Sequence, residues 1–322
     1  MKNRVLVTGG AGFIGSHVCQ RLLAAGSQVH ILDNLDAFYD PAIKRHNLAL
    51  LSAQGGADCQ FFEGDIRSAD ACKTAIRGCD SVIHLAALAG VRPSIVDPVR
   101  YMEVNVTGTQ VLLQQIDSKQ VQFVFGGSSS VYGSNKKVPF AECDSVENPM
   151  SPYAASKRAG ELLCSTFHHL HGNPVVVLRF FTVYGPRQRP EMAIHLFARS
   201  IKNGTPLPFY GDGETRRDYT FVEDIASGVA LAVTKAKGFG TYNLGGSATT
   251  SLRELVAALE AQLGQTAILR RLPDQAGDVP ITCADIRLAE RDLGYRCTTT
   301  VQEGLRRFCD WYLIERTAGR IQ

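Results

Sequence analysis

The hydrophobic residues in the first half of the chain fall into short runs that alternate with longer, helix-length segments. Six runs rich in β-branched residues lie at 5–8, 29–33, 59–63, 81–85, 121–125 and 175–179. Each run is continuous rather than alternating in polarity, which is typical of parallel strands buried on both faces. The pattern predicts an α/β fold built on a doubly wound parallel sheet.

The second half of the chain is expected to divide between that sheet and a smaller domain. We expect the larger domain to comprise residues 1–180, with 224–246 returning to it as a helix followed by a strand. The remainder of 181–322 is predicted to form a smaller α/β domain, whose later helices begin near Ser251 and Val301.

Composition gives no reason to expect a nucleic-acid or membrane partner. The 322 residues carry 34 Lys and Arg against 31 Asp and Glu, so the net charge does not favour binding to nucleic acid or to an anionic membrane. No apolar run approaches the ~20 residues of a membrane-spanning helix. We therefore expect a cytoplasmic protein.

The nine cysteines are scattered and include no Cys-x-x-Cys pair. This spacing argues against a disulfide framework and against a zinc site, so we expect reduced thiols and no bound metal. Cys164 shares a predicted helix with Tyr153 and is the one candidate for a reactive thiol.

A glycine turn, Gly9-x-x-Gly12-x-x-Gly15, lies between the first predicted strand and a helix. The glycines allow a tight turn and close approach of the backbone to a pyrophosphate, and the helix N-terminus attracts its charge. Asp33 closes the second strand, where a carboxylate accepts hydrogen bonds from an adenosine ribose and repels a 2′-phosphate. The motif predicts a Rossmann domain that binds NAD rather than NADP. The alternative is a purely structural turn with Asp33 as a helix cap.

Further strand ends are expected to meet at the same edge of the sheet. Small residues follow the fourth strand, and Asp65 follows the third, where it either accepts from the adenine amino group or caps the next helix. His84 lies on an apolar strand and is interpreted as a core histidine. The expected cofactor-binding residues are Gly9, Gly12, Phe13, Ile14, Gly15, Asp33, Asn34, Asp65, Ile66, Leu85, Ala86, Ala87, Ala89, Tyr153 and Lys157.

A tyrosine and a lysine four residues apart form the candidate catalytic group. Ser151 is a good helix N-cap and Pro152 suits the first helical position, so Tyr153 and Lys157 are predicted to share one helix face. The lysine charge is expected to favour the phenolate and to lower the pKa of the tyrosine. Ser128, at the end of the fifth strand, supplies a second hydroxyl, which completes a proton-handling triad. The alternatives are a chance Tyr–Lys pair on an exposed face and a serine turn.

With these residues in this order, the chain resembles the extended short-chain dehydrogenase/reductase family, which contains nucleotide-sugar epimerases and dehydratases. The resemblance covers nearly the whole chain. It implies that Tyr153 is the base and that Lys157 also bonds the nicotinamide ribose. It further implies an NAD-binding Rossmann domain at 1–180, a UDP-sugar-binding domain at 181–322, and a homodimer formed through the Tyr153 helix and the one near 102–116.

Within that family, the second half most resembles UDP-glucuronate 4-epimerases. Residues 178–193 are similar to the corresponding stretch of these enzymes, and Thr182 stands where UDP-galactose 4-epimerases usually carry Asn. Residues 208–213 resemble the family's uridine-binding loop. Without the resemblance, the arginines of this region are equally a solvated basic face. The resemblance implies the substrate-binding residues Ser129, Ser130, Thr182, Arg187, Arg189, Phe209, Tyr210, Arg217 and Asp278.

The expected reaction is epimerisation at one carbon. Tyr153 takes the proton of the sugar 4-hydroxyl, hydride passes to NAD, and the 4-keto sugar turns before hydride returns to its other face. The family's dehydratases need an Asp-Glu pair where this chain has Ser129-Ser130, and its decarboxylases typically carry Glu in place of Ser130. Both side reactions are therefore disfavoured. A 4-keto uronate must keep its carboxylate in an unreactive orientation, which we assign to Arg189 with Thr182, Arg187 being the second choice.

Two other functions stay open at this level. One is 4-epimerisation of UDP-glucose or UDP-N-acetylglucosamine, in which the arginines serve only the diphosphate. The other is a catalytically idle NAD-binding regulatory protein on the same fold.

Overall fold

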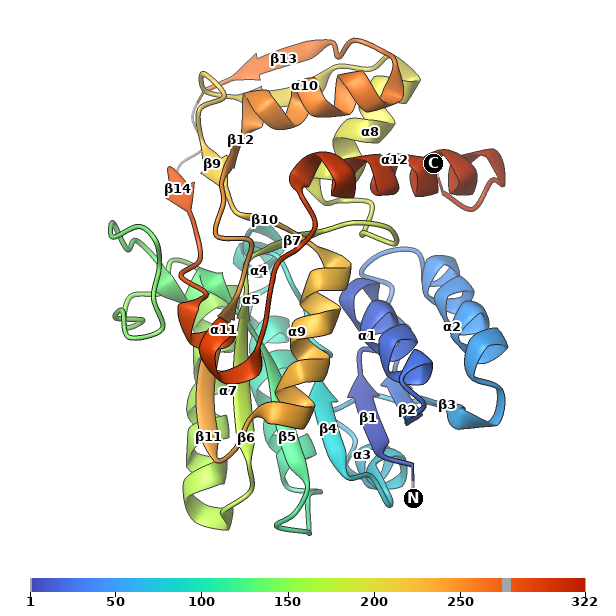
Figure 1. The fold of residues 1–322 in the computed structure, drawn as a ribbon, viewed down its shortest axis with the longest axis vertical. Helices are drawn as coiled ribbons and strands as arrows, with labels where there is room; N and C mark the ends of the chain where they lie inside the picture. The colour runs from blue at the N-terminus through green and yellow to red at the C-terminus, as the bar shows by residue number, and fades with distance from the viewer. Residues whose placement is uncertain (1, 274–278, 322) are drawn as a thin grey trace.

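A computed structural model describes residues 2–273 and 279–321. Its centre is a seven-stranded sheet in the order β11-β6-β5-β4-β1-β2-β3, in which every neighbouring pair is parallel (Figure 1). The predicted doubly wound parallel sheet is confirmed. The strands are β1 (Arg4–Thr8), β2 (Gln28–Asp33), β3 (Cys59–Glu63), β4 (Ser81–His84), β5 (Gln122–Ser128), β6 (Val175–Phe180) and β11 (Phe239–Leu244).

Alternate residues of the inner strands enter two separate hydrophobic cores, one on each face of the sheet, whereas the edge strand β3 is half-buried or exposed, contrary to the prediction for 59–63. Val5 and Val7 of β1 pack in one core, and Leu6 between them packs in the other. This explains the continuous apolar runs, because both faces of a strand are buried. One face carries α1 (Phe13–Ala24), α2 (Pro41–Gly55), α9 (Val222–Lys235) and α11 (Arg287–Leu293); the other carries α3 (Ala69–Ile76), α4 (Val91–Val96), α5 (Pro98–Met102), α6 (Gly108–Leu113) and α7 (Pro152–His171).

Helix α7 begins where the sequence predicts. The Ser151 side chain accepts a hydrogen bond from the Ala154 backbone N–H at 3.1 Å, and Pro152 occupies the first turn. The segment near 102–116 is less regular than predicted, because a π-helical turn (Glu103–Thr107) separates α5 from α6.

The smaller part of the molecule sits over the carboxyl ends of the central strands (Figure 1). Its core is formed by α8 (Ala193–Asn203), α10 (Leu252–Leu263) and α12 (Val301–Thr317). Helix α11 lies instead against α9 and β11, in the layer of the large sheet. The remaining strands are short: β7 (Thr182–Tyr184), β8 (Leu207–Tyr210), β9 (Arg216–Arg217), β10 (Tyr219–Phe221), β12 (Thr250–Ser251), β13 (Leu269–Leu272) and β14 (Ile281–Thr282).

Among residues 2–273 and 279–321, none of the helices has the length and apolar character needed to cross a membrane.

Candidate active site

A cavity of about 720 Å³ opens at the carboxyl ends of β1 to β6, between the sheet and the smaller part. In doubly wound sheets ligands bind at this edge, because the order of the strands reverses there and leaves a crevice between the connecting loops. The cavity is lined by all of the residues expected to bind the cofactor: Gly9, Gly12, Phe13, Ile14, Gly15, Asp33, Asn34, Asp65, Ile66, Leu85, Ala86, Ala87, Ala89, Tyr153 and Lys157.

The glycine turn has the geometry that a pyrophosphate cradle requires. Gly9 has a φ of +71°, and a Cβ there would lie 2.7 Å from the Ala86 backbone nitrogen. A Cβ on Gly15 would lie 2.1 Å from the Gly9 carbonyl oxygen. Helix α1 starts from Gly12 with no side-chain cap, so its first N–H groups remain for an anion. The residues present therefore fit a dinucleotide.

Asp33 is held firmly at the end of β2. Its two carboxylate oxygens accept from the backbone N–H groups of Leu35 at 2.9 Å and Ala11 at 3.2 Å. Burial raises the pKa of Asp33, and the ammonium of Lys44, 4.0 Å away, opposes that rise. Lys44 also lines the cavity. Lys44 was not among the predicted residues, because it comes from α2, which carries no motif of its own.

The surroundings of Asp65 contradict one of its two predicted roles, that of capping the next helix. Its carboxylate accepts from the Arg67 side chain at 2.9 Å and from Asn34 at 2.9 Å. These hydrogen bonds to Arg67 lower the pKa of Asp65 to about 2. The cap of α3 is Ser68, not Asp65, so the helix-cap interpretation was wrong.

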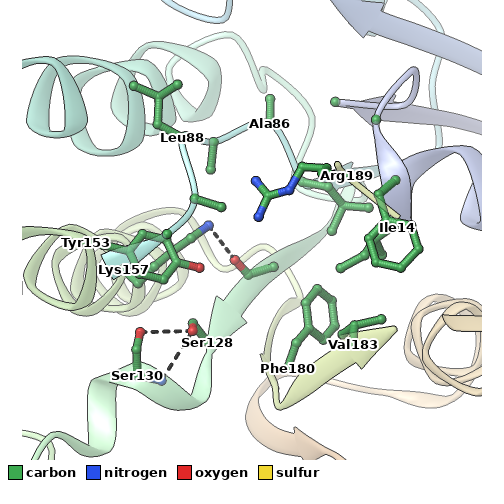
Figure 2. Close-up of a pocket in the computed structure, with 18 of the residues that line it drawn as sticks. Ile14, Ala86, Leu88, Ser128, Ser130, Tyr153, Lys157, Phe180, Val183 and Arg189 are labelled. Atoms are coloured by element: carbon green, nitrogen blue, oxygen red, sulfur yellow. Dashed lines mark hydrogen bonds between the residues drawn. The ribbon is translucent and has the colours of Figure 1, made fainter. Parts of the chain in front are cut away.

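Ser128, Tyr153 and Lys157 lie together in this cavity, at the end of β5 and the start of α7 (Figure 2). The Ser128 Oγ accepts from the Ser130 backbone N–H at 3.2 Å and from the Ser130 hydroxyl at 2.9 Å. The Lys157 ammonium donates to the Gly126 carbonyl at 2.8 Å. The end of β5 and the start of α7 therefore place these three side chains in the same part of the cavity.

The predicted effect of Lys157 on Tyr153 was wrong for this arrangement. Burial raises the pKa of Tyr153, and the opposing influences are the Ser128 hydroxyl and the charge of Arg189. Burial also lowers the pKa of Lys157 to about 8. The reason is geometric: the ammonium of the buried Lys157 is directed to the Gly126 carbonyl, and Tyr153 is itself half-buried.

The structure separates the predicted substrate-binding residues into three groups. Ser129, Ser130, Thr182, Arg189 and Arg217 line the large cavity. Tyr210 lines an adjoining cavity of about 400 Å³, which Arg189 and Arg217 also border. Phe209 and Arg187 line neither cavity, and Asp278 falls outside the described residues.

Local geometry explains the two residues that point elsewhere. Along β8, side chains alternate, so Phe209 is buried in the smaller core while Tyr210 faces the cavity. Arg187 has a positive φ of 63°, and its guanidinium is directed to Gln20 of α1. Placing Arg187 and Phe209 at the substrate was therefore wrong for this structure.

Phe38 and Arg92 are further cavity residues that were not among the predicted site residues. Phe38 borders both cavities beneath Arg189, whose guanidinium carbon is 5.6 Å from the ring centroid. Arg92 also borders both, and its guanidinium carbon is 5.5 Å from the Tyr210 ring centroid. Their position depends on loops that meet only in the folded chain.

Two other polar candidates belong to the core. His84 bonds Thr8 at 2.7 Å and Thr109 at 2.9 Å, and burial lowers its pKa to about 3, so the interpretation as a core histidine is confirmed. Cys164 is fully buried, and burial raises the pKa of its thiol, which makes it unreactive. All nine cysteines are free.

Comparison with known proteins agrees with this geometry. The model of the NAD dependent epimerase/dehydratase family matches residues 5–245. UDP-glucuronate 4-epimerase 4 of Arabidopsis thaliana is 40% identical over 331 residues, covering 96% of this chain and 75% of that protein.

Two solved structures share the whole fold. The UDP-glucuronic acid 4-epimerase of Bacillus cereus, in complex with UDP-glucuronic acid and NAD, has a TM-score of 0.90 at 34% identity and covers 97% of this chain and 99% of that one. The dTDP-glucose 4,6-dehydratase DesIV of Streptomyces venezuelae, with NAD bound, has a TM-score of 0.90 at 36% identity and covers 98% of each chain. The chain belongs to the NAD dependent epimerase/dehydratase family.

Proposed function

We propose that this protein is an NAD-dependent 4-epimerase of UDP-sugars that interconverts UDP-glucuronate and UDP-galacturonate through a 4-keto sugar. The observation that carries the proposal is the wall of the cavity around Tyr153, where serine hydroxyls and Arg189 lie in place of carboxylates. The similarity to proteins named as UDP-glucuronate 4-epimerases supports the choice of substrate.

The residues of the glycine turn, with Asp33 at the ribose, would hold NAD. When bound, NAD supplies the acceptor for a hydride from carbon 4 of the sugar and the donor that returns it. Gly9, Gly12 and Gly15 keep the backbone clear for the pyrophosphate, and Asp33 excludes a 2′-phosphate by its charge.

Tyr153 moves the proton of the sugar 4-hydroxyl. Its phenolate oxygen accepts this proton as the ketone forms and returns it to the same oxygen as the ketone is reduced. One group therefore serves as base and then as acid, and no second acid is needed. Ser128 donates to the reacting oxygen, and Lys157, with a pKa of about 8, brings positive charge to the site near neutral pH.

The identity of residues 129 and 130 argues against elimination of water or loss of carbon dioxide. Elimination requires an acid and a base beside the sugar, and the chain places Ser129 and Ser130 there. The carboxylates among the described lining residues are Asp33, Asp36 and Asp65, which follow β2 and β3 at the adenosine end. Among the lining residues that the structure describes there is no such acid pair, although the fold is shared with a dehydratase.

Arg189 is the residue we assign to the uronate carboxylate, with Thr182 beside it. Figure 2 shows its guanidinium directed into the cavity that holds Tyr153, Lys157 and Ser128. A guanidinium binds a carboxylate through two parallel hydrogen bonds, which fixes its plane. A fixed plane keeps the carboxylate of the β-keto acid from turning perpendicular to the ketone. Arg187 does not line the cavity and is set aside for this role.

Product analysis tests the function. Purified protein incubated with UDP-glucuronate should yield UDP-galacturonate without added cofactor if NAD is retained. Tyr153→Phe should lower kcat by about 10²- to 10⁴-fold, because the acid–base group is lost. Tyr295→Phe removes another buried phenol hydroxyl, one that donates to the Gly245 carbonyl outside the cavity, and should leave kcat unchanged.

Three outcomes would contradict the proposal. Formation of a UDP-pentose would mean that the site decarboxylates. Faster turnover of UDP-glucose than of UDP-glucuronate would assign the arginines to the diphosphate alone. Equal activity of Tyr153→Phe and wild type would remove the phenol from the reaction.

We also propose a cytoplasmic homodimer with two domains, divided at 1–180 plus 224–246 and the rest of 181–322. The free state of all nine cysteines supports a reducing compartment. Exposed apolar side chains on α5 and α7, namely Val99, Met102 and Leu162, support these helices as the interface. Sedimentation analysis of the wild type against Leu162→Glu tests the dimer.

A further inference from the structure

Arg189 has a carboxylate partner within the chain itself. The Arg189 Nε lies 3.1 Å from the Glu191 Oε1, and within the described part of the chain Glu191 is the carboxylate at ion-pair distance from it. The arginine side chain is only 18% exposed, whereas the glutamate side chain is 42% exposed. The arginine is therefore held in the wall, and the glutamate is the partner that has room to leave.

The loop beneath Arg189 fixes it in place. Phe38 supplies an aromatic face under the guanidinium, and its backbone N–H donates to Asp36 at 2.9 Å. Asp36 is in turn held by Arg100 at 2.7 Å. Because the closest contact with Glu191 is made by Nε, the pair is side-on, and the guanidinium remains directed into the cavity (Figure 2).

We propose that Glu191 is an internal counter-ion that occupies Arg189 in the substrate-free protein, must be displaced by an anionic sugar, and so limits the preference of the site for a uronate over a neutral sugar. The inference rests on the proposed function, in which Arg189 receives the uronate carboxylate. Glu191 is a specificity-determining residue in this account and takes no part in the chemistry.

The charges of the two residues act on the same surroundings with opposite sign. Arg189 lowers and Glu191 raises the pKa of Tyr101, the ring of which packs edge-on against Tyr153. The same opposition holds at Tyr39. A uronate entering this space meets an arginine that is already partly neutralised and a carboxylate that repels it. A neutral hexose meets neither effect, since it offers no charge to attract or repel.

The position of Glu191 distinguishes it from an ordinary surface ion pair. Glu191 and Arg189 both border the adjoining cavity, which also contains Tyr210 and Arg217. The pair Arg253–Glu214 has a similar contact, at 3.1 Å, but both of its side chains are more than half exposed and border neither cavity. Glu214→Gln is therefore a matched control for loss of a paired carboxylate.

The test compares Glu191→Gln with wild type by titration calorimetry and steady-state kinetics on UDP-glucuronate and on UDP-glucose. We expect the Kd and KM for UDP-glucuronate to fall about two- to fivefold in Glu191→Gln, the effect of a partly exposed ion pair. The constants for UDP-glucose should not change, and Glu214→Gln should change neither. Glu191→Ala, which lacks the side-chain amide that Glu191→Gln retains, should give the same result. Circular dichroism should confirm the fold of each variant.

The outcomes separate this inference from the proposed function. An equal gain for both sugars would assign Glu191 to the diphosphate and overturn the inference. Unchanged or weaker uronate binding in Glu191→Gln, in a protein whose wild type epimerises UDP-glucuronate, would also overturn it while leaving the function intact. A wild type that does not act on UDP-glucuronate, with an Arg189→Ala variant that binds it equally well, would overturn both.

Discussion

The helix that carries Tyr153 and Lys157 is anchored to the sheet by a buried ion pair. Arg179 of β6 meets Glu161 of α7 through two parallel contacts, Nε to Oε1 at 2.8 Å and Nη2 to Oε2 at 2.9 Å, and each side chain is only 4% exposed. Burial acts to lower the pKa of Arg179, but the hydrogen bonds to Glu161 and its negative charge outweigh that effect and raise the pKa. We predict that Arg179→Met is among the most destabilising substitutions outside the cavity.

The magnitude follows from what the substitution leaves behind. Glu161 would remain buried with Arg158 as its partner, at 3.0 Å, and Arg158 is itself 31% exposed. Removing one partner of a buried ion pair costs roughly 3–5 kcal/mol, because the other charge is left without compensation in a medium of low dielectric. Retention of Arg158 places the expected loss near the lower end, about 3 kcal/mol.

Urea unfolding followed by circular dichroism measures this loss, with Arg306→Met as the control. Arg306 of α12 pairs with Glu303 and Asp310, but these side chains are about half exposed, so its loss should cost much less stability than that of Arg179. The double variant Arg179→Met/Glu161→Met removes both buried charges and should be more stable than Arg179→Met alone.

Two results would refute this reasoning. If Arg179→Met loses no more stability than Arg306→Met, the buried pair does not hold α7 in place. If the double variant is the less stable, by the sum of the two single losses, the residues act independently and no uncompensated charge is involved.

Two further predictions concern stability against pH and the glycine turn. Burial lowers the pKa of both His17 and His84 to about 3, so below pH 6.5 the unfolded chain binds protons that the folded chain excludes. The free energy of unfolding is therefore highest above about pH 6.5 and falls as the pH falls toward 3. At pH 5 the loss is about 2 kcal/mol for each histidine. Urea unfolding midpoints measured at several pH values should fall less on acidification in His17→Gln than in wild type, and should fall as in wild type in the exposed His169→Gln. The same pH dependence in both variants would contradict the prediction. Gly15→Ala would place a Cβ 2.1 Å from a backbone carbonyl oxygen and should strongly weaken NAD binding, measured by fluorescence titration. Gly26→Ala, at a φ of +81° with open space around it, should cost only about 1 kcal/mol of backbone strain and leave NAD binding unchanged. Equal NAD affinity in the two variants would contradict the role of the glycine turn in binding the pyrophosphate.

The sheet was predictable because its signal is local and repeated. The inner strands show as largely apolar runs, and the two cores that receive alternate residues of β1 require those runs. The glycine turn was predictable for a similar reason, since Gly9 and Gly15 occupy positions where a Cβ would meet backbone atoms. Each of these structural requirements restricts which residue types can stand at fixed spacings in the chain, so it can be read from the sequence.

The direction of individual side chains was not predictable in the same way. Arg187 and Arg189 are two residues apart in one loop, and only the positive φ of Arg187 turns it toward α1 while Arg189 enters the cavity. Lys157 was placed on the correct helix face, yet the Gly126 carbonyl that receives its ammonium comes from β5. Lys44 reaches Asp33 from α2. These contacts join segments far apart in the chain, and no pattern within one segment encodes them.

The charges of the large cavity divide along its length, and this division restricts the chemistry. Asp33, Asp36 and Asp65 lie where β2 and β3 end, and Arg189 and Arg217 lie at the side of the smaller part. Carboxylates at the acidic end suit the hydroxyls of a ribose, and arginines at the basic end would attract an anionic sugar nucleotide. Between them, the described wall near Tyr153 presents serine hydroxyls beside the Lys157 ammonium. The carboxylates among the described lining residues of this cavity all lie at the acidic end, and a phenol that takes and returns one proton confines the reaction to a single carbon.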